Sequence, residues 1–451
     1  MNKNIIVIGG NAAGPAAAAK AKRTDPNANV LLFEASEFIS TGTCELPYVL
    51  SGEIKDYNDI VFYSAKSFEE EKGVRVYTNS LVTNIDRRNK TITVTNTSTN
   101  QSYNFTYDKL ILTTGSISKR LSQLPINLEN VFSFKSVGDL IKVKSFIEKH
   151  NPKRVLVIGA GYIGIEISEA LKNIGLEVIL LEKEKLPMPG SEAEIQNLIL
   201  QTLLKNKIQF FGNSIDVKYY FDESKLRSVK IDGWNYEIDF AIQSLGVKPN
   251  TTLALSAKLD LGNFGGIKVD SKLRTSDSNI YAAGDCIEVI NKITNRNDYL
   301  PLATLAHEHG HIAGENAAGG NSFIHPVINN IAVKIFDNNF VSVGLNSIQA
   351  IKNNFNVLSV SAIVPNIIKV MPNSKNVFGK IIYEKDSLKI LGANFFGDKE
   401  VIGFGDLISS FIYHKNKITD LAEINFNYTP PSSPFINLLS VLGRKAKKET
   451  R

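Results

Sequence analysis

Residues 154–182 read RVLVIGAGYIGIEISEALKNIGLEVILLE and hold every part of a strand–turn–helix–strand unit. An apolar run typical of a strand buried on both faces ends at Gly159, and a helical pattern begins after Gly161. Gly159 permits the tight turn, Gly161 lets the backbone approach a pyrophosphate, and Gly164 allows close packing of helix on strand. Glu182 follows the second strand, where a carboxylate accepts hydrogen bonds from ribose hydroxyls. The stretch therefore predicts a dinucleotide-binding βαβ unit.

The charge at Glu182 bears on which nicotinamide dinucleotide fits this unit. A carboxylate repels a 2′-phosphate, which favours NADH over NADPH. Lys183 and Lys185 follow directly and weaken that repulsion, so NADPH stays an open alternative.

A second copy of this unit lies at the start of the chain. Residues 5–8 (IIVI) form an apolar run, an alanine-rich helical segment follows, and residues 30–33 (VLLF) end at Glu34. The turn of this copy consists of Gly9, Gly10, Asn11, Ala12, Ala13 and Gly14. Asn11 replaces the middle glycine, which a small residue can do if the phosphate lies slightly further out. Two copies imply two dinucleotide-binding domains in one chain.

Further strands follow each of the two units, and the sequence pattern changes in the last quarter of the chain. Residues 108–116 (DKLILTTGS) and 239–250 (DFAIQSLGVKPN) each contain an apolar strand that ends in a turn of small residues. Residues 278–286 (SNIYAAGDC) contain another strand, which ends in Gly-Asp. Residues 90–107 predict an exposed β-meander. In the last quarter of the chain the glycine-rich turns stop, and alternating segments such as 331–336 indicate an antiparallel sheet with helices.

We therefore predict an α/β fold with two Rossmann-like dinucleotide-binding domains and a C-terminal α+β domain. The expected boundaries are 1–118 for the first part of the first dinucleotide domain, 119–246 for the second dinucleotide domain, 247–323 for the rest of the first, and 324–451 for the C-terminal domain.

Composition and charge narrow the compartment and the partners. Two cysteines in 451 residues argue against a disulfide framework and for a reducing, cytoplasmic compartment. The net charge of +6 is modest, and the basic tail at 443–451 is typical of a solvated end, so we expect no nucleic-acid partner. The apolar run at 5–8 is too short for a signal peptide, and no run is long enough to cross a bilayer, so we expect no membrane partner.

One of the two cysteines lies in residues 40–48, STGTCELPY. Cys44 is either a small buried core residue or a thiol placed to react. The thiolate is the nucleophile, and if Cys44 begins a helix, the positive end of the helix dipole lowers its pKa. Glu45 opposes thiolate formation if it points at the sulfur, but a place in the first helical turn suits its charge better. Cys286 follows a Gly-Asp pair in a strand and is expected to be structural.

Together with residues 281–285 (YAAGD), the two units resemble the flavoprotein disulfide reductases that bind two dinucleotides. In that family the first unit binds FAD, the second binds a nicotinamide cofactor, and the C-terminal domain forms a homodimer. STGTCELPY and residues 428–433 (YTPPSS) are similar to segments of the single-cysteine branch. This branch comprises coenzyme A disulfide reductases, persulfide or polysulfide reductases and NADH oxidases, and the resemblance spans essentially the whole chain.

The resemblance implies roles for residues at matching positions. Beyond the two turns, Glu34 and Glu182, it implies cofactor contacts at Thr114, Gly115, Tyr162, Ile163, Glu166, Gly246, Gly284, Asp285, Ala303 and Thr304. It implies contacts to a phosphate-bearing substrate such as coenzyme A at Lys20, Arg23, Ser40, Thr43, Lys72 and His307. Cys44 would form a mixed disulfide with a small-molecule disulfide or persulfide, and Tyr428 would reach the partner subunit's active site and protonate the leaving thiolate.

Two departures from the branch bear on the substrate, and Glu166 stands apart from its counterpart in two-cysteine reductases. Residues 362–365 read AIVP where the branch has Tyr-Tyr-Pro with a catalytic tyrosine, and Ile436 stands near the place of a basic residue. Glu166 resembles a glutamate that lies beside the nicotinamide, but its usual lysine partner belongs to a two-cysteine motif that this chain lacks. Glu166 is therefore assigned only a cofactor-side role, while the changes at 362–365 and at Ile436 weaken the case for CoA disulfide and strengthen the case for smaller acceptors.

Two other functions therefore stay open. One is an NADH oxidase or peroxidase that cycles through a sulfenic acid on Cys44. The other is an FAD protein whose reduced state signals to a partner. His307 and His311 share a helical face, but two ligands do not make a zinc site, so we expect no metal.

Overall fold

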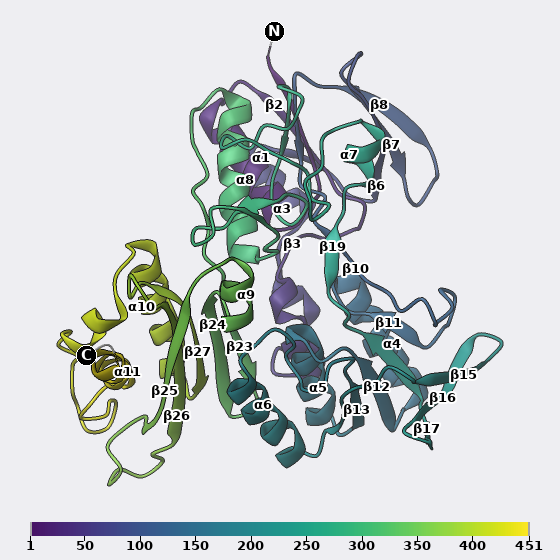
Figure 1. The fold of residues 1–451 in the computed structure, drawn as a ribbon. Helices are drawn as coiled ribbons and strands as arrows, with labels where there is room; N and C mark the ends of the chain where they lie inside the picture. The colour runs from purple at the N-terminus through teal and green to yellow at the C-terminus, as the bar shows by residue number, and fades with distance from the viewer. Residues whose placement is uncertain (1, 450–451) are drawn as a thin grey trace.

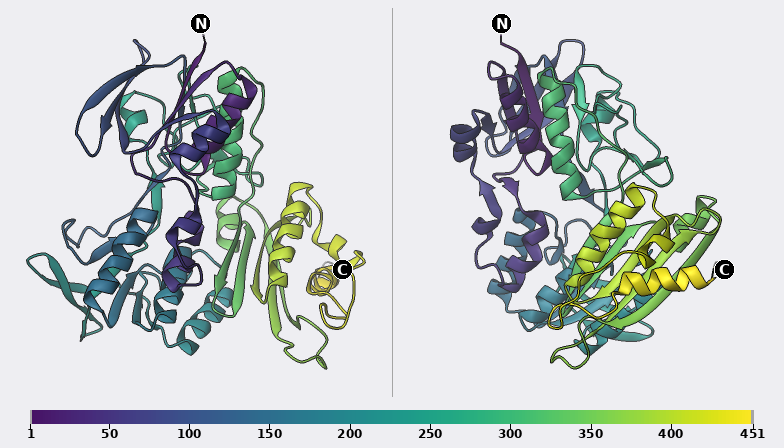
Figure 2. Two further views of the ribbon diagram at one scale, coloured as in Figure 1. Left: turned by 180° about the vertical axis from the view of Figure 1, so that it is seen from behind. Right: turned by 90° about the vertical axis from the view of Figure 1, so that its left-hand side faces the viewer.

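The computed structural model describes residues 2–449, which form three five-stranded sheets with helices against them (Figures 1 and 2). In Figure 1 the first sheet lies at the top with helices α1 (Ala13–Thr24) and α8 (Ala303–Ala318), the second lies at lower right, and the third at lower left. The predicted α/β class is confirmed. Within residues 2–449, no helix is long and apolar enough to span a membrane.

The first sheet is parallel, with the strand order β20-β9-β1-β2-β5. Its strands are β1 (Asn4–Ile8), β2 (Asn29–Phe33), β5 (Arg75–Tyr77), β9 (Lys109–Leu112) and β20 (Ile280–Ala282). Helices α1 and α8 pack along a seam of small residues. A Cβ on Gly310 would come within 2.3 Å of the Ala13 carbonyl oxygen, and one on Gly314 within 2.1 Å of that of Ala17. The seam lets the two helices run parallel at close range.

Smaller elements lie around the first sheet and form the first region with it, except for one short helix and the 3-10 turn after it, which pack on the region of the second sheet. They are β3 (Ile39–Thr41), η1 (Thr43–Glu45), α2 (Leu46–Ser51), η2 (Tyr57–Ile60), β4 (Val61–Tyr63), α3 (Ala65–Lys72), α7 (Thr252–Ser256), β21 (Val289–Ile290) and β22 (Asn297–Asp298). An antiparallel sheet of β6 (Ser80–Asp86), β7 (Thr91–Asn96) and β8 (Ser102–Thr106) forms the predicted meander.

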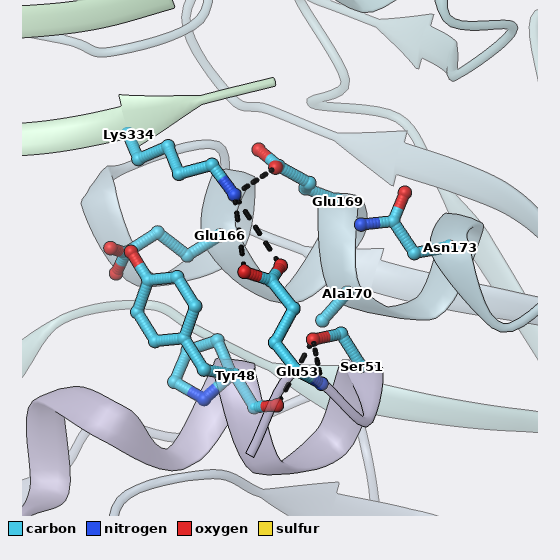
Figure 3. A pocket seen from close by; sticks show the side chains of 9 residues that line it. Tyr48, Ser51, Glu53, Glu166, Glu169, Ala170, Asn173 and Lys334 are labelled. Atoms are coloured by element: carbon cyan, nitrogen blue, oxygen red, sulfur yellow. Dashed lines mark hydrogen bonds and ion pairs between the residues drawn. The ribbon is translucent and has the colours of Figure 1, made fainter. Parts of the chain in front are cut away.

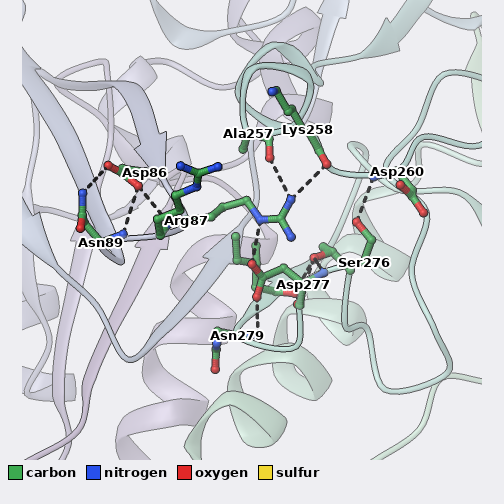
Figure 4. Close-up of polar contacts among 12 residues, drawn as sticks. Asp86, Arg87, Asn89, Ala257, Lys258, Asp260, Ser276, Asp277 and Asn279 are labelled. Carbon is green, nitrogen blue, oxygen red and sulfur yellow. Dashed lines mark hydrogen bonds and ion pairs between the residues drawn. The ribbon is translucent and has the colours of Figure 1, made fainter.

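Arg87 joins two segments of this region that are far apart in the sequence (Figure 4). Its Nε donates to Asp277 Oδ2 at 2.8 Å, and its NH1 donates to the carbonyl oxygens of Ala257 and Lys258 at 3.2 and 3.1 Å. Residues before the second unit therefore pack against residues after it, so the first region is built from two stretches of chain.

The second sheet is also parallel and has the order β11-β18-β12-β13-β14. Its strands are β11 (Val131–Ser133), β12 (Arg154–Ile158), β13 (Glu177–Leu181), β14 (Gln209–Phe211) and β18 (Phe240–Gln243), and its helices are α4 (Val137–His150), α5 (Tyr162–Asn173) and α6 (Ala193–Lys205). A hairpin sheet of β15 (Lys218–Asp222), β16 (Lys225–Ile231) and β17 (Trp234–Glu237) projects from it in Figure 1. The chain enters and leaves this region through β10 (Ser116–Ser118) and β19 (Val247–Pro249), which pair antiparallel.

The third sheet is antiparallel, as predicted, with the order β23-β24-β27-β26-β25. Its strands are β23 (Asn330–Ile335), β24 (Asn338–Gly344), β25 (Val357–Pro365), β26 (Asn376–Glu384) and β27 (Ile390–Gly397). The remaining helices are α9 (Ser347–Lys352), α10 (Glu400–Tyr413), η3 (Ile418–Ala422) and α11 (Leu438–Glu449). Buried leucines of α11 join the core beneath β25 and β26.

Candidate active site

The two glycine turns have the same backbone geometry. Gly9 and Gly159 lie at φ of +111° and +103°, in the left-handed region that favours glycine. A Cβ on Gly14 would lie 1.8 Å from the Gly9 carbonyl oxygen, and one on Gly164 would lie 1.9 Å from that of Gly159. The first and last glycines of each turn are therefore required by backbone packing alone.

The acid that follows each turn holds the turn in place. Glu34 Oε2 accepts the N–H of Gly10 at 2.7 Å, and Glu182 Oε2 accepts the N–H of Ala160 at 2.8 Å. Each carboxylate thus lies at the turn beside its helix N-terminus, where a ribose would sit next to a bound pyrophosphate.

A hydroxyl on the neighbouring strand closes each turn, which the sequence analysis missed. Thr113 Oγ1 donates to the carbonyl oxygen of Ile8 at 2.8 Å, and Ser244 Oγ donates to that of Gly159 at 2.8 Å. Aligning KLILTTG with FAIQSLG brings Thr113 opposite Ser244, so a comparison of the two repeats could have identified these two hydroxyl residues.

The two turns differ at their middle position. A Cβ on Gly161 would meet no atom within 4 Å, so only open space lies beside this position. Asn11 instead folds its side chain toward the cysteine segment, and its Oδ1 accepts the N–H and the hydroxyl of Thr41, both at 3.1 Å. Ser40, at φ +50°, donates its N–H to the Gly10 carbonyl oxygen at 2.7 Å. The first turn is therefore bonded to the segment that carries Cys44.

Gly284 and Asp285 lie between the two parallel helices. A Cβ on Gly284 would lie 3.0 Å from the Cβ of Ala13 and 3.3 Å from that of Ala306. Asp285 Oδ2 accepts the Ser116 hydroxyl at 2.8 Å, and Lys135 Nζ lies 4.0 Å away. The N-terminal part of α1, the first turns of α8 and Asp285 thus meet at one place.

These residues fit FAD. The N-terminal N–H groups of α1 suit a pyrophosphate and Glu34 suits a ribose, while α8 begins at Ala303, one of the positions for which the resemblance implies a cofactor contact. A Cβ on Gly115 would meet no atom within 4 Å, so this glycine, like Gly161, leaves space that a side chain would take from a cofactor. Thr114 and Gly246 lie nearby, at the link between the first two regions, where Thr114 Oγ1 donates to the Asn250 carbonyl oxygen at 2.6 Å.

Cys44 lies in η1, directly before the short helix α2, and is a free, exposed thiol. Burial raises the pKa of the Cys44 thiol, and the charges of Glu45, Glu166 and Asp285 raise it further, against a smaller lowering by Lys135. The surface of this residue is open to solvent, but the thiol lies close enough to protein atoms to be partly desolvated. The predicted lowering of this pKa by a helix dipole is therefore wrong.

The side chain of Glu45 explains part of this result. A Cβ on Gly42 would lie 2.5 Å from Glu45 Oε2, so the carboxylate folds back over the cysteine segment. Glu45 lies in the first turn of η1 and is the N-cap residue of α2, so its predicted place in the first helical turn is confirmed, although its charge also raises the pKa of Cys44. Cys286 is fully buried, as expected of a structural cysteine, and burial raises its pKa to about 11.

Helix α2 packs against α5, and a cleft lies where both meet the third sheet (Figure 3). Its lining residues are Pro47, Tyr48, Ser51, Glu53, Glu166, Glu169, Ala170, Asn173 and Lys334. Burial raises the pKa of Glu166 to about 7, and the charge of Glu169 adds to this effect. The carboxyl predicted to lie beside the nicotinamide is therefore close to half-protonated at neutral pH.

A family model described as pyridine nucleotide-disulphide oxidoreductase matches residues 3–310. The chain belongs to this family. It is 30% identical over 445 residues to an NADH oxidase of Methanocaldococcus jannaschii, covering 98% of each chain. It is 29% identical over 449 residues to a coenzyme A disulfide reductase of Staphylococcus epidermidis, covering 99% of this chain and all of that protein.

Solved structures agree with this assignment. A NAD-dependent persulfide reductase from A. fulgidus matches with a TM-score of 0.94 at 31% identity, covering 99% of this chain and 83% of that one. This pyridine nucleotide-disulphide oxidoreductase therefore uses FAD and NAD(P)H.

Three of the six predicted substrate residues of this oxidoreductase lie on α1 and α8. Arg23 NH2 lies 3.4 Å from His311 Nδ1, the rings of His307 and His311 are 4.6 Å apart, and Lys20 pairs with Glu315 at 2.8 Å. His311 was not predicted to bind substrate, although its spacing from His307 indicated a shared face. No group of three or more His, Cys, Asp or Glu residues suited to a metal occurs within residues 2–449.

The other predicted residues lie at two further places. Lys72, at the end of α3, pairs with Glu71 at 2.7 Å and lies 5.1 Å above the Tyr63 ring. Thr43 and Ser40 flank the cysteine turn. Tyr428 lies in the C-terminal domain, 43% exposed, with its ring 5.3 Å from that of Phe435.

Two predicted nicotinamide-side residues differ in exposure. Ile163 is 38% exposed at the start of α5, whereas Tyr162 packs its ring 6.3 Å from that of Phe340 in the third sheet. Burial raises the pKa of Tyr162 to about 12.

Proposed function

We propose that this protein is an FAD-dependent NAD(P)H:disulfide oxidoreductase that reduces coenzyme A disulfide, or a coenzyme A persulfide or polysulfide, through a mixed disulfide on Cys44. The observation that carries the proposal is a free, exposed thiol at Cys44 in a chain whose other cysteine, Cys286, is fully buried. With no second thiol available in the chain, Cys44 takes its sulfur partner from the substrate. The relatives named for coenzyme A disulfide and for persulfide support this reading.

The proposed chemistry divides the work between Cys44 and the cofactors. The Cys44 thiolate attacks one sulfur of R–S–S–R, so a Cys44–S–S–R bond forms and the other half leaves as a thiolate. FAD, when bound, supplies two-electron transfer from NAD(P)H. Two electrons and one proton then cleave the mixed disulfide, which releases the second thiol and restores the Cys44 thiolate.

Cations near the ends of α1 and α3 support recognition of a phosphate-bearing substrate. Arg23, His307 and His311 form one cluster, and Lys20 lies one turn away on the same helix. A Cβ on Gly73 would lie 3.4 Å from the Lys22 side chain, so the end of α3, with Lys72, adjoins α1. Phosphates of coenzyme A suit the Arg23 guanidinium and the imidazole donors beside it, while Lys20 and Lys72 are paired with Glu315 and Glu71.

We further propose a cytoplasmic homodimer formed through the C-terminal domain, with the domain boundaries given above. Large apolar side chains there are exposed, among them Ile363 at 61%, Val370 at 86% and Phe435 at 76%. A second copy of the chain would cover them and bring Tyr428 toward the partner's Cys44. Light scattering of the purified protein tests this: a dimer mass is expected, and a monomer at all concentrations contradicts it.

Steady-state NADH consumption tests the proposed function. Coenzyme A disulfide, coenzyme A persulfide, polysulfide, peroxide and dioxygen are compared side by side, with wild type and Cys44→Ser. We expect sulfur acceptors to be preferred and their turnover to disappear in Cys44→Ser. Turnover of disulfide that persists in this variant would exclude the thiol mechanism.

A second function has its own support. The Tyr-Tyr-Pro segment of the branch is replaced by residues 362–365 (AIVP) in β25, and one relative is named NADH oxidase. In this alternative Cys44 cycles through sulfenic acid with peroxide or dioxygen. Faster NADH consumption with dioxygen or peroxide than with any sulfur acceptor would favour it.

A further inference from the structure

Lys334 joins the third sheet to the two helices α2 and α5 (Figure 3). It lies in β23 of the third sheet and reaches into the cleft between α2 and α5. Its Nζ lies 3.4 Å from Glu53 Oε1, just after α2, and 3.5 Å from Glu169 Oε1 on α5. The same ammonium lies 5.6 Å from the centre of the Tyr48 ring on α2. One side chain thus contacts the helix that follows Cys44 and the helix that carries Glu166.

We propose that Lys334 is a positioning residue for NAD(P)H oxidation, which sets α2, the helix that follows Cys44, against the nicotinamide-side helix α5 and compensates the acidic side chains between them. The inference rests on the proposed oxidation of NAD(P)H. It does not depend on which disulfide or oxidant is used afterwards.

The charges in the cleft explain why a cation is needed there. Three carboxyls, Glu53, Glu166 and Glu169, line it with the phenol of Tyr48, and Lys334 is the cation among its lining residues. Burial alone would lower the pKa of Lys334, but Glu169 and Glu53 outweigh it and raise that pKa. Burial raises the pKa of Glu169, while the N–H of Phe336, at 2.5 Å, and the Lys334 charge oppose the rise.

Glu166 receives no such compensation. It has no ion pair or hydrogen bond within residues 2–449, and Cys44, Tyr48 and Glu169 are the titratable groups whose charges interact with it. Because Glu166 and Glu169 lie one helical turn apart, they titrate as a coupled pair. Removing the Lys334 charge therefore moves the apparent pKa values of the pair upward.

The chain offers a matched control in Lys380. This lysine lies in β26 of the same sheet and also pairs with carboxylates of the second region, Glu192 at 2.7 Å and Glu194 at 2.9 Å. It is more buried than Lys334, with 12% of its side chain exposed against 39%. Lys380 does not contact α2 or the carboxyls of the cleft, so its loss affects stability without the proposed positioning.

The test is rapid anaerobic mixing of NADH with the oxidised holoenzyme, without any disulfide, at a series of pH values. For Lys334→Met we expect flavin reduction to slow about tenfold and its pH dependence to move to higher pH, because helix placement and carboxyl charge both change. Lys334→Arg should restore most of the rate. Lys380→Met should stay within about twofold of wild type with an unmoved pH dependence, even if it unfolds at a lower temperature.

Two results would overturn the inference. One is equal behaviour of Lys334→Met and Lys380→Met in rate and pH dependence. The other comes from Glu53→Gln, which removes the ion pair between Lys334 and the residue after α2 and leaves the pair with Glu169 in place. This variant serves if Lys334→Met does not retain flavin, and an unchanged rate of flavin reduction in it contradicts positioning of α2 through that ion pair. Because no disulfide is present, failure of coenzyme A disulfide as substrate leaves this test intact.

Discussion

The two glycine turns of this molecule share one backbone plan and differ at their middle residue. Both have a left-handed first glycine, a buried last glycine, an acid bonded to the second N–H and a hydroxyl from the next strand. Asn11 bonds the first turn to the segment of Cys44, whereas Gly161 leaves the second turn open. The difference suits a retained cofactor beside the thiol in the first case, and a dinucleotide that enters and leaves in the second.

The largest expected effects come from the last glycine of each turn. Gly14→Ala places a Cβ 1.8 Å from a carbonyl oxygen, so we expect purified protein without FAD. Gly164→Ala has the same clash in the second turn and should keep FAD but lose NADH-driven flavin reduction by about a hundredfold. Flavin absorbance per chain and rapid mixing with NADH measure the two. Normal flavin content in Gly14→Ala would refute the role of the first turn.

Substitution of the two acids should also affect the NADH site and the FAD site separately, with smaller effects than the glycine substitutions. In Glu182→Ala, loss of charged hydrogen bonds to a ribose should raise the KM for NADH about tenfold, and loss of repulsion should improve NADPH relative to NADH. Glu34→Ala is the matched control, because it should reduce FAD content and leave the KM ratio unchanged. An unaltered NADH-to-NADPH ratio in Glu182→Ala contradicts the assignment.

Asn11→Gly makes the first turn like the second. We expect FAD to stay bound, and the rate of Cys44 alkylation by iodoacetamide to change about threefold, because the bonds to Thr41 are lost. Thr41→Val removes only the hydroxyl and should show a smaller change. Identical alkylation rates in wild type and both variants would mean that the link does not position the thiol.

The smallest effect concerns stability and pH at Glu166. Its pKa is raised by burial to about 7, so the folded state holds a proton that the unfolded state releases at lower pH. Stability is therefore greatest below the unfolded pKa and falls as pH rises toward about 7. Glu166→Gln should remove that fall, raising the unfolding temperature at neutral pH by about 2–4 °C. A pH dependence of unfolding identical to that of wild type contradicts the assignment.

Local sequence patterns predicted the elements whose conformation depends on residues that are close in the sequence. Both turns and the antiparallel C-terminal sheet follow from spacing and residue type, and the structure contains them. The pKa of Cys44 and the composition of the cleft depend instead on residues that are distant in the sequence. The pKa of Cys44 is raised partly by Glu166 and Asp285, which come from distant parts of the chain. Lys334 reaches the cleft from the third sheet, so nothing in its local sequence marked it.

The reaction of Cys44 with coenzyme A disulfide is the most direct test of the central claim. Oxidised holoenzyme is mixed anaerobically with coenzyme A disulfide and analysed by intact and peptide mass spectrometry, before and after NADH is added. We expect one coenzyme A per chain on Cys44, released as free thiol by NADH, and no adduct in Cys44→Ser. Absence of the adduct in wild type, with NADH consumption by coenzyme A disulfide unchanged in Cys44→Ser, would contradict the account.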